Sequence, residues 1–111
     1  MVHEGEAGLP LYVDNIVFGG DLKDGFFVEA GSLDGEITSN TLHFELTHNW
    51  TGLLVEAHPI FYGQGLRKHR NVTSIMTCLG LEDRWVQRRF VSIYISIFPD
   101  LTSWTLICKP L

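Results

Sequence analysis

The chain has 111 residues, of which 45% are hydrophobic and 19% charged, and its formal net charge is −5. This composition excludes a disordered or collagen-like chain, and the length suits one domain with a modest core. Two cysteines exclude a disulfide-dense scaffold and a four-cysteine zinc site. No apolar run reaches the roughly 18 residues of a membrane-spanning helix, and the acidic start is unlike a signal peptide as it stands.

Charge is distributed unevenly along the chain. Residues 1–60 hold ten acids and one base, for −9, whereas residues 61–111 hold three acids and seven bases, for +4. The bases cluster as Arg67, Lys68 and Arg70 and then as Arg84, Arg88 and Arg89. We interpret both clusters as solvated helix faces or loops, with a phosphate- or RNA-binding patch as the alternative. The acidic total argues against nucleic acid as a partner.

The first third of the chain predicts a lead-in, a helix and a strand. Residues 1–10 are a flexible lead-in, because they carry two glycines and a proline. Apolar spacing predicts a short helix over residues 11–18, ended by the glycine pair at 19 and 20. Residues 26–30 form a compact apolar run between glycines, which predicts a buried parallel strand.

The middle of the chain continues the alternation of helix and strand. A helix is predicted from Glu36 to about Thr47, although the apolar residues at 42, 44 and 46 also alternate as in a strand. A second buried strand is predicted at residues 53–56, and a third strand is predicted at residues 72–79. Between them a helix is predicted over residues 60–69, with Pro59 at its start. This βαβαβ order predicts an α/β fold, half of a doubly wound sheet.

The most informative segment lies between the first strand and the helix after it. Glu29 ends the strand, and Gly31 and Gly35 bracket a loop that includes Asp34. Gly31 permits a sharp turn at the carboxyl end of the strand, where ligands of open α/β sheets bind. A tight structural turn is the alternative interpretation.

Glu56 closes the second strand, 21 residues after Gly35. A carboxylate at this position can accept hydrogen bonds from both hydroxyls of an adenosine ribose. The alternative is an acidic residue at the amino end of the helix that starts near Pro59. Because the three-glycine dinucleotide pattern is absent, the loop and Glu56 favour an adenosine-type ligand other than NAD.

Several segments together resemble FkbM-type methyltransferase domains, and within them the arthropod branch of Star and Star-like proteins. The segments are GFFVEAG at 25–31, DGE at 34–36, SNTL at 39–42, WTGLLVE at 50–56 and Pro59. With weaker matches at its flanks, the resemblance covers about residues 11–81 and leaves the tail at 82–111 unassigned. It implies a Rossmann-like, S-adenosylmethionine-dependent methyltransferase fold, of which these residues supply the amino-terminal half.

The resemblance also implies roles for individual residues. Glu29, Gly31 and Gly35 would line the methionine end of S-adenosylmethionine, Glu56 would hold the ribose hydroxyls, and Asp34 belongs to the same loop. Catalytic residues and the methyl acceptor are not assigned by it. Active relatives transfer methyl groups to oxygen, often on sugars or small metabolites, so the expected partner is a small-molecule or glycan acceptor.

A non-catalytic role is the alternative that the same family implies. Star-like proteins act in trafficking of membrane cargo among the endoplasmic reticulum, Golgi and endosomes, whereas an enzyme without an anchor would be cytoplasmic. Star-like proteins typically carry a membrane anchor, and complete methyltransferase domains need about four further strands. We therefore expect these 111 residues to be inactive alone, with an open sheet edge that leaves Phe26, Phe27 and Val28 partly exposed.

The remaining polar residues predict little chemistry. None of the five histidines is spaced for metal binding with a carboxylate or cysteine, so we expect no metal; His58 alone borders the adenosine site. Cys78 is interpreted as a small buried hydrophobe, with a disulfide to Cys108 as the alternative in an oxidising compartment. Asn49 and Asn71 match the glycosylation pattern, and the run at 91–98 predicts an edge strand.

Overall fold

The structure is a computed structural model that describes residues 8–80, 82–91 and 103–110. It divides into two compact units, Met1–Met76 and Thr77–Leu111, and each contains its own three-stranded sheet. The first unit ends at Met76, whereas the family resemblance extends to residue 81. In the described part of the chain, no helix is long and apolar enough to cross a bilayer.

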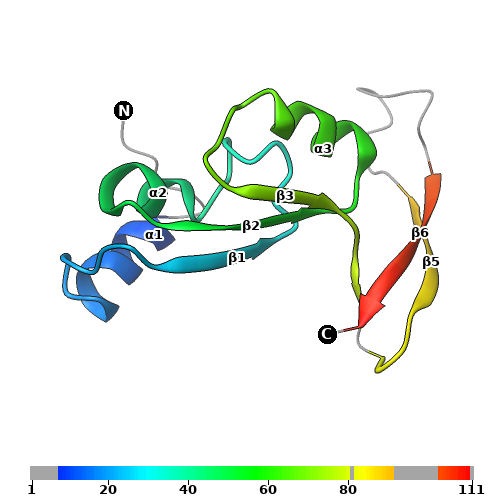
Figure 1. Cartoon of the computed structure of the whole chain (residues 1–111), viewed down its shortest axis with the longest axis horizontal. Helices are drawn as coiled ribbons and strands as arrows, with labels where there is room; N and C mark the ends of the chain where they lie inside the picture. The colour runs from blue at the N-terminus through cyan, green and yellow to red at the C-terminus, as the bar shows by residue number, and fades with distance from the viewer. Residues whose placement is uncertain (1–7, 81, 92–102, 111) are drawn as a thin grey trace. The chain divides into compact units, whose positions relative to one another are not determined.

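The first unit is a mixed α/β structure built on a parallel sheet (Figure 1). Its strands are β1 (Phe26–Ala30), β2 (Thr51–Glu56) and β3 (Thr73–Met76), in the order β1-β2-β3. Both neighbouring pairs are parallel. The three predicted strands and their parallel order are therefore confirmed, with the third strand shorter than the predicted range of 72–79.

Of the two expectations for the first strand, burial holds for Phe27 alone, and partial exposure holds for Phe26 and Val28 but not for Phe27. Phe27 is buried in β1, whereas Phe26 and Val28 are 66% and 59% exposed. Phe27 packs in a core cluster with Phe44, Trp50 and Leu54, whereas Phe26 and Val28 lie on the other face of β1. The apolar run could not reveal this, because burial on a second face depends on an element elsewhere in the chain.

A helical segment precedes the sheet, as predicted, but it begins at Leu9, inside the predicted flexible lead-in, and Pro10 is buried. It consists of α1 (Leu9–Tyr12) followed directly by one π-helical turn, η1 (Val13–Val17). Gly19 and Gly20 end the segment with φ angles of 74° and 83°, which L side chains adopt at a cost. Figure 1 shows this segment and α2 (Leu42–His48) near the amino ends of the strands.

The helix predicted from residue 36 begins only at Leu42. The preceding residues form turns because side chains compete for their amides. Oδ1 of Asp34 accepts hydrogen bonds from the amides of Glu36 and Ile37, at 2.9 and 3.0 Å. Oε1 of Glu29 accepts from the amide of Asn40 at 2.7 Å. Such local acceptors replace the helical carbonyls, which shortens the helix from its amino end.

The next helix, α3 (Pro59–Leu66), packs against β2 and β3. Pro59 lies in its first turn, as predicted, and Nδ1 of His58 caps it by accepting from the amide of Ile60 at 3.2 Å. The helix ends before the predicted His69, which has a left-handed φ of 53°. Gly65 permits a close approach of α3 to the loop, because a Cβ there would lie 3.3 Å from the carbonyl oxygen of Asp34.

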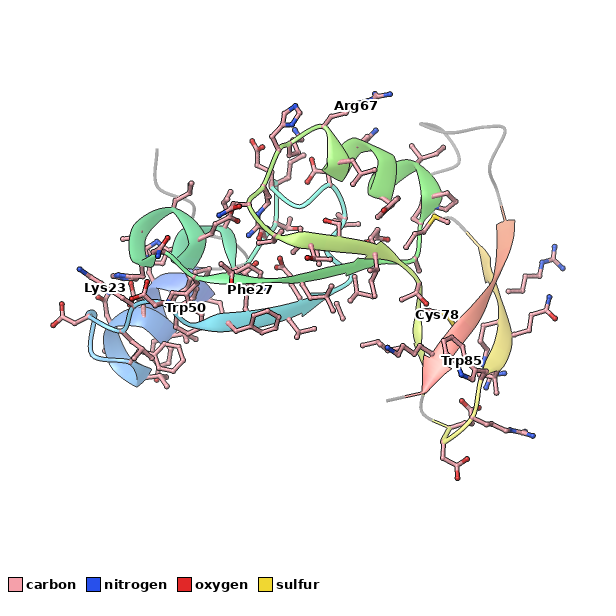
Figure 2. The ribbon with its side chains drawn as sticks, in the orientation of Figure 1. Lys23, Phe27, Trp50, Arg67, Cys78 and Trp85 are labelled. Carbon is pink, nitrogen blue, oxygen red and sulfur yellow. A yellow bond between two sulfur atoms is a disulfide. The ribbon has the colours of Figure 1, made fainter. Side chains whose placement is uncertain are left out.

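An aromatic cluster forms the core of the first unit. Phe27, Phe44, Trp50 and Leu54 are buried together, and Nε1 of Trp50 donates to the carbonyl of Leu22 at 2.9 Å. Figure 2 shows Trp50 beside the amino-terminal helical segment. A Cβ on residue 25 would lie 2.5 Å from the Trp50 ring, so this position must be glycine.

The second unit is a small sheet closed by a disulfide. Its strands are β4 (Leu79–Gly80), β5 (Val86–Val91) and β6 (Ser103–Pro110), in the order β4-β6-β5. Cys78 is bonded to Cys108, so its interpretation as a small buried hydrophobe is wrong and the disulfide alternative holds. Of the edge strand predicted at 91–98, only Val91 is described, as the last residue of β5, and the remainder lies outside the described residues.

Candidate functional site

The glycine loop lies at the carboxyl edge of the parallel sheet, beside the end of β2. The amides of Gly31 and Ser32 donate to the carbonyl of Val55, at 2.8 and 3.2 Å. Gly31 and Gly35 have φ angles of 73° and 76°, which explains why glycine occupies both positions. A Cβ on Gly31 would meet nothing within 4 Å, so the loop presents open backbone at this point.

Glu56 joins this loop to the turn that follows β2. Its Oε2 accepts from the amide of Leu33 at 2.7 Å, and its Oε1 accepts from the amide of His58 at 2.9 Å. The residue is buried, and Leu33 itself holds a left-handed φ of 51°. An ionised carboxylate offers about four lone-pair sites, so Glu56 keeps capacity for a further donor such as a hydroxyl.

Glu29 lies at the same edge but is occupied by the protein itself. Its carboxylate accepts from the hydroxyls of Ser39 and Thr41, at 2.9 and 2.8 Å, and from the amide of Asn40. The side chain of Arg70 approaches it to 3.7 Å. These bonds hold the turn at 39–41 against the end of β1. The role of Glu29 in this arrangement is therefore to position that turn beside the glycine loop.

Asp34 is likewise buried and bonded within the loop. Besides capping the turn at Glu36 and Ile37, it lies 3.8 Å from the ammonium of Lys68. Its carbonyl faces α3 at the point where Gly65 permits close approach. Asp34 therefore fixes the loop between the sheet and α3.

Arg70 is a buried residue beside the glycine loop that sequence reasoning missed. The chain segment at 67–70 was predicted to be solvated, and Arg67 and Lys68 are indeed exposed. The Arg70 side chain is only 5% exposed. It donates to the carbonyl of Gly35 at 2.9 Å and to Oε2 of Glu45 at 2.6 Å. In the sequence, only its position within the family resemblance singled out Arg70. A cluster of basic residues does not show which of its side chains is buried.

His58 borders the site as predicted. Its ring packs on Phe61 with centroids 4.6 Å apart, and it is buried. Burial lowers the pKa of His58, and the nearby negative charge of Glu56 opposes part of that shift. The neutral ring suits its role as an acceptor at the start of α3.

A second polar cluster lies among the amino-terminal helices, away from the glycine loop. Oδ2 of Asp14 contacts Nε2 of both His43 and His48, at 2.7 Å each. Burial raises the pKa of the Asp14 carboxyl, but hydrogen bonds and positive charge from the two histidines outweigh this, so its pKa lies below the ordinary value. The interpretation of these histidines as surface or capping residues is wrong. They are five residues apart on α2, with four residues between them.

A cavity of about 350 Å³ lies at the amino ends of the strands, whereas the glycine loop lies at their carboxyl ends. Phe26, Thr51 and Thr73, which begin the three strands, line it together with Arg70. In open α/β sheets ligands bind at the carboxyl ends of strands, so this cavity is not part of the candidate cofactor site.

No family model, curated protein or solved structure matches this chain.

Proposed function

We propose that residues 11–81 belong to a Rossmann-like domain of the FkbM methyltransferase type and bind S-adenosylmethionine at the glycine loop. The observation that carries the proposal is the 2.7 Å hydrogen bond from the Leu33 amide to Glu56. It places a carboxylate between the loop after β1 and the end of β2, where an adenosine ribose lies in open α/β sheets. The open backbone at Gly31 is consistent with a ligand at this edge.

The residues divide into two groups in this proposal. Gly31 and Gly35 shape the loop, and Glu56 accepts hydrogen bonds from the ribose hydroxyls with its remaining lone pairs. Glu29 and Asp34 are occupied by turn amides and hydroxyls, so we assign them to positioning the loop. When bound, S-adenosylmethionine supplies an electrophilic methyl group, and a small-molecule or glycan hydroxyl is the proposed acceptor.

Isothermal titration with S-adenosylmethionine tests the proposal. Glu56→Ala should weaken binding about 5- to 150-fold, because a lost hydrogen bond to a charged group is worth about 1–3 kcal/mol. Glu36→Ala is the matched control, since Glu36 is an exposed acid three residues beyond Leu33 and should leave affinity unchanged. Equal affinity of Glu56→Ala and wild type would remove the ribose role, and no binding by folded wild type would refute the cofactor.

A Star-like role in endomembrane trafficking is the second proposal. The disulfide between Cys78 and Cys108 favours it, because such bonds form in oxidising compartments such as the endoplasmic reticulum lumen. Both Asn49 and Asn71 of the glycosylation triplets are exposed, as modification there requires. Alkylation of free thiols in intact cells, followed by mass analysis, should find both cysteines blocked by the disulfide. Alkylated cysteines in a cytosolic fraction would contradict this proposal and leave the cofactor proposal untouched.

A further inference from the structure

The cluster of Asp14, His43 and His48 brings three metal-ligating groups to one point. Each offers one ligand atom, and these atoms lie within 4.8 Å of one another. Asp14 comes from η1, and the two histidines come from α2. The three side chains are 12% exposed or less, so the point where they meet is largely shielded from water.

The hydrogen bonding of this cluster is incomplete. Both histidines compete for Oδ2 of Asp14, while the other oxygen, Oδ1, is buried and has no hydrogen-bond partner among the described residues. Nδ1 of His48 is also buried, and the described part of the chain offers it no hydrogen-bond partner. Buried polar atoms without partners are costly, and a cation bound at Oδ1 of Asp14 would satisfy that oxygen.

We propose that Asp14, His43 and His48 bind a divalent transition-metal ion of the zinc class, which joins the amino-terminal helical segment to α2. Two imidazole nitrogens and one carboxylate oxygen form a donor set that Zn²⁺ and its neighbours prefer, whereas Ca²⁺ and Mg²⁺ prefer oxygen alone. The fourth position of a tetrahedral site would be filled by water or a further ligand.

The distances in the structure are those of hydrogen bonds between Asp14 and the two histidines. Ligand atoms about 2.0–2.2 Å from a tetrahedral zinc ion lie about 3.3 Å from each other. On metal binding the two Nε2–Oδ2 distances of 2.7 Å would open by about half an ångström. Ligand atoms that are farther apart, within the 4.8 Å spread of the group, would move closer, and both changes would require rotation of the side chains. Each ring then binds through the Nε2 lone pair and keeps its hydrogen on Nδ1, and an imidazolium ring releases one proton to solvent.

The surroundings support a site rather than a simple bridge between helices. The Phe44 ring packs against His43 and His48, with centroids 5.4 and 6.5 Å apart, and limits access of water. Asp14 lies in a π-helical turn, a form of helix that is rare and recurs at functional sites. The turn places the carboxylate between the two rings.

Titration of the chelator-treated full chain with Zn²⁺ tests the proposal, followed by thermal unfolding. One equivalent of Zn²⁺ should raise the unfolding midpoint by several degrees, whereas the same concentration of Mg²⁺ should not. Asp14→Asn and His43→Gln should bind Zn²⁺ at least tenfold more weakly. His69→Asn is the matched control, because His69 is exposed and asparagine tolerates its left-handed φ.

A measurement on wild type keeps the test decisive if the variants do not fold. Long-range ¹H–¹⁵N NMR distinguishes the ring nitrogens of each histidine. Zn²⁺ should shift Nε2 of His43 and His48 and leave His69 unchanged. Absence of Zn²⁺ uptake by the folded chain, or shifts confined to other histidines, would overturn the proposal.

Discussion

Arg70 and Glu45 form a buried ion pair, with Nε of Arg70 2.6 Å from Oε2 of Glu45. Their side chains are 5% and 9% exposed. The same guanidinium also donates to the carbonyl of Gly35 and to Oγ of Ser39. One side chain from the segment after α3 therefore connects the glycine loop, the turn before α2 and α2 itself.

Loss of this guanidinium should strongly destabilise the first unit. Arg70→Gln should lower the free energy of unfolding by about 3–5 kcal/mol, because it leaves the carboxylate of Glu45 buried without its partner. Urea unfolding followed by tryptophan fluorescence measures the change. Arg67→Gln is the control, since Arg67 is exposed and points outward in Figure 2, and its effect should stay within about 0.5 kcal/mol. Equal effects of the two variants would contradict the role given to Arg70.

Two glycines should respond oppositely to alanine. Gly35 has a φ of 76°, and a Cβ there would lie 3.2 Å from Cδ1 of Leu54, so Gly35→Ala should cost about 1–2 kcal/mol. Gly63 lies within α3 with open space around its Cα, so Gly63→Ala should stabilise the unit by about 0.5–1 kcal/mol. Differential scanning calorimetry of both variants gives the signs. A stabilising Gly35→Ala would show that the loop does not hold this conformation.

Acidification should weaken the start of α3 through His58. Because the folded-state pKa of His58 is lowered from 6.5, the unfolded chain binds the proton more readily. The stability that neutral His58 contributes is therefore present above pH 6.5 and is lost as the pH falls below it. Protonation also removes the Nδ1 acceptor that caps the amide of Ile60, and such a cap is worth about 1 kcal/mol.

The variant His58→Asn isolates this effect from the other histidines. Asparagine caps a helix at any pH. The unfolding free energy of wild type should therefore fall relative to that of His58→Asn as the pH is lowered. Chemical denaturation at several pH values around 6.5 measures it. A difference that does not change with pH would show that His58 does not titrate in this way.

The disulfide should stabilise only the second unit. Cys78 and Cys108 are 30 residues apart, and closing a loop of this length stabilises by about 3–4 kcal/mol in the chain-entropy account. The double variant Cys78→Ser, Cys108→Ser should increase amide hydrogen exchange in β5 and β6. Exchange in β1, β2 and β3 should not change, because these strands belong to the other unit. Free thiols in the purified, unreduced wild type would contradict the bond.

Local pattern alone was sufficient for the parallel strands and the glycine loop. The strand at Phe26–Ala30 and the strand at Thr51–Glu56 are runs of residues that favour extended backbone, bounded by glycine or polar residues. The glycines at 31 and 35 and the acid at 56 also lie where the order of elements predicts, because parallel strands bring their carboxyl ends to one edge.

Only the tertiary structure decided which polar side chains are partners. Arg70 reaches Glu45 across 25 residues, and Asp14 reaches His43 and His48 across 29 and 34. Sequence spacing carries no information about such pairs, since their contact depends on how helices pack on the sheet. The late start of α2 has the same cause: the amide of Asn40 is taken by Glu29, a residue of another element. Periodicity describes one element at a time, whereas burial of charge is determined by several elements together.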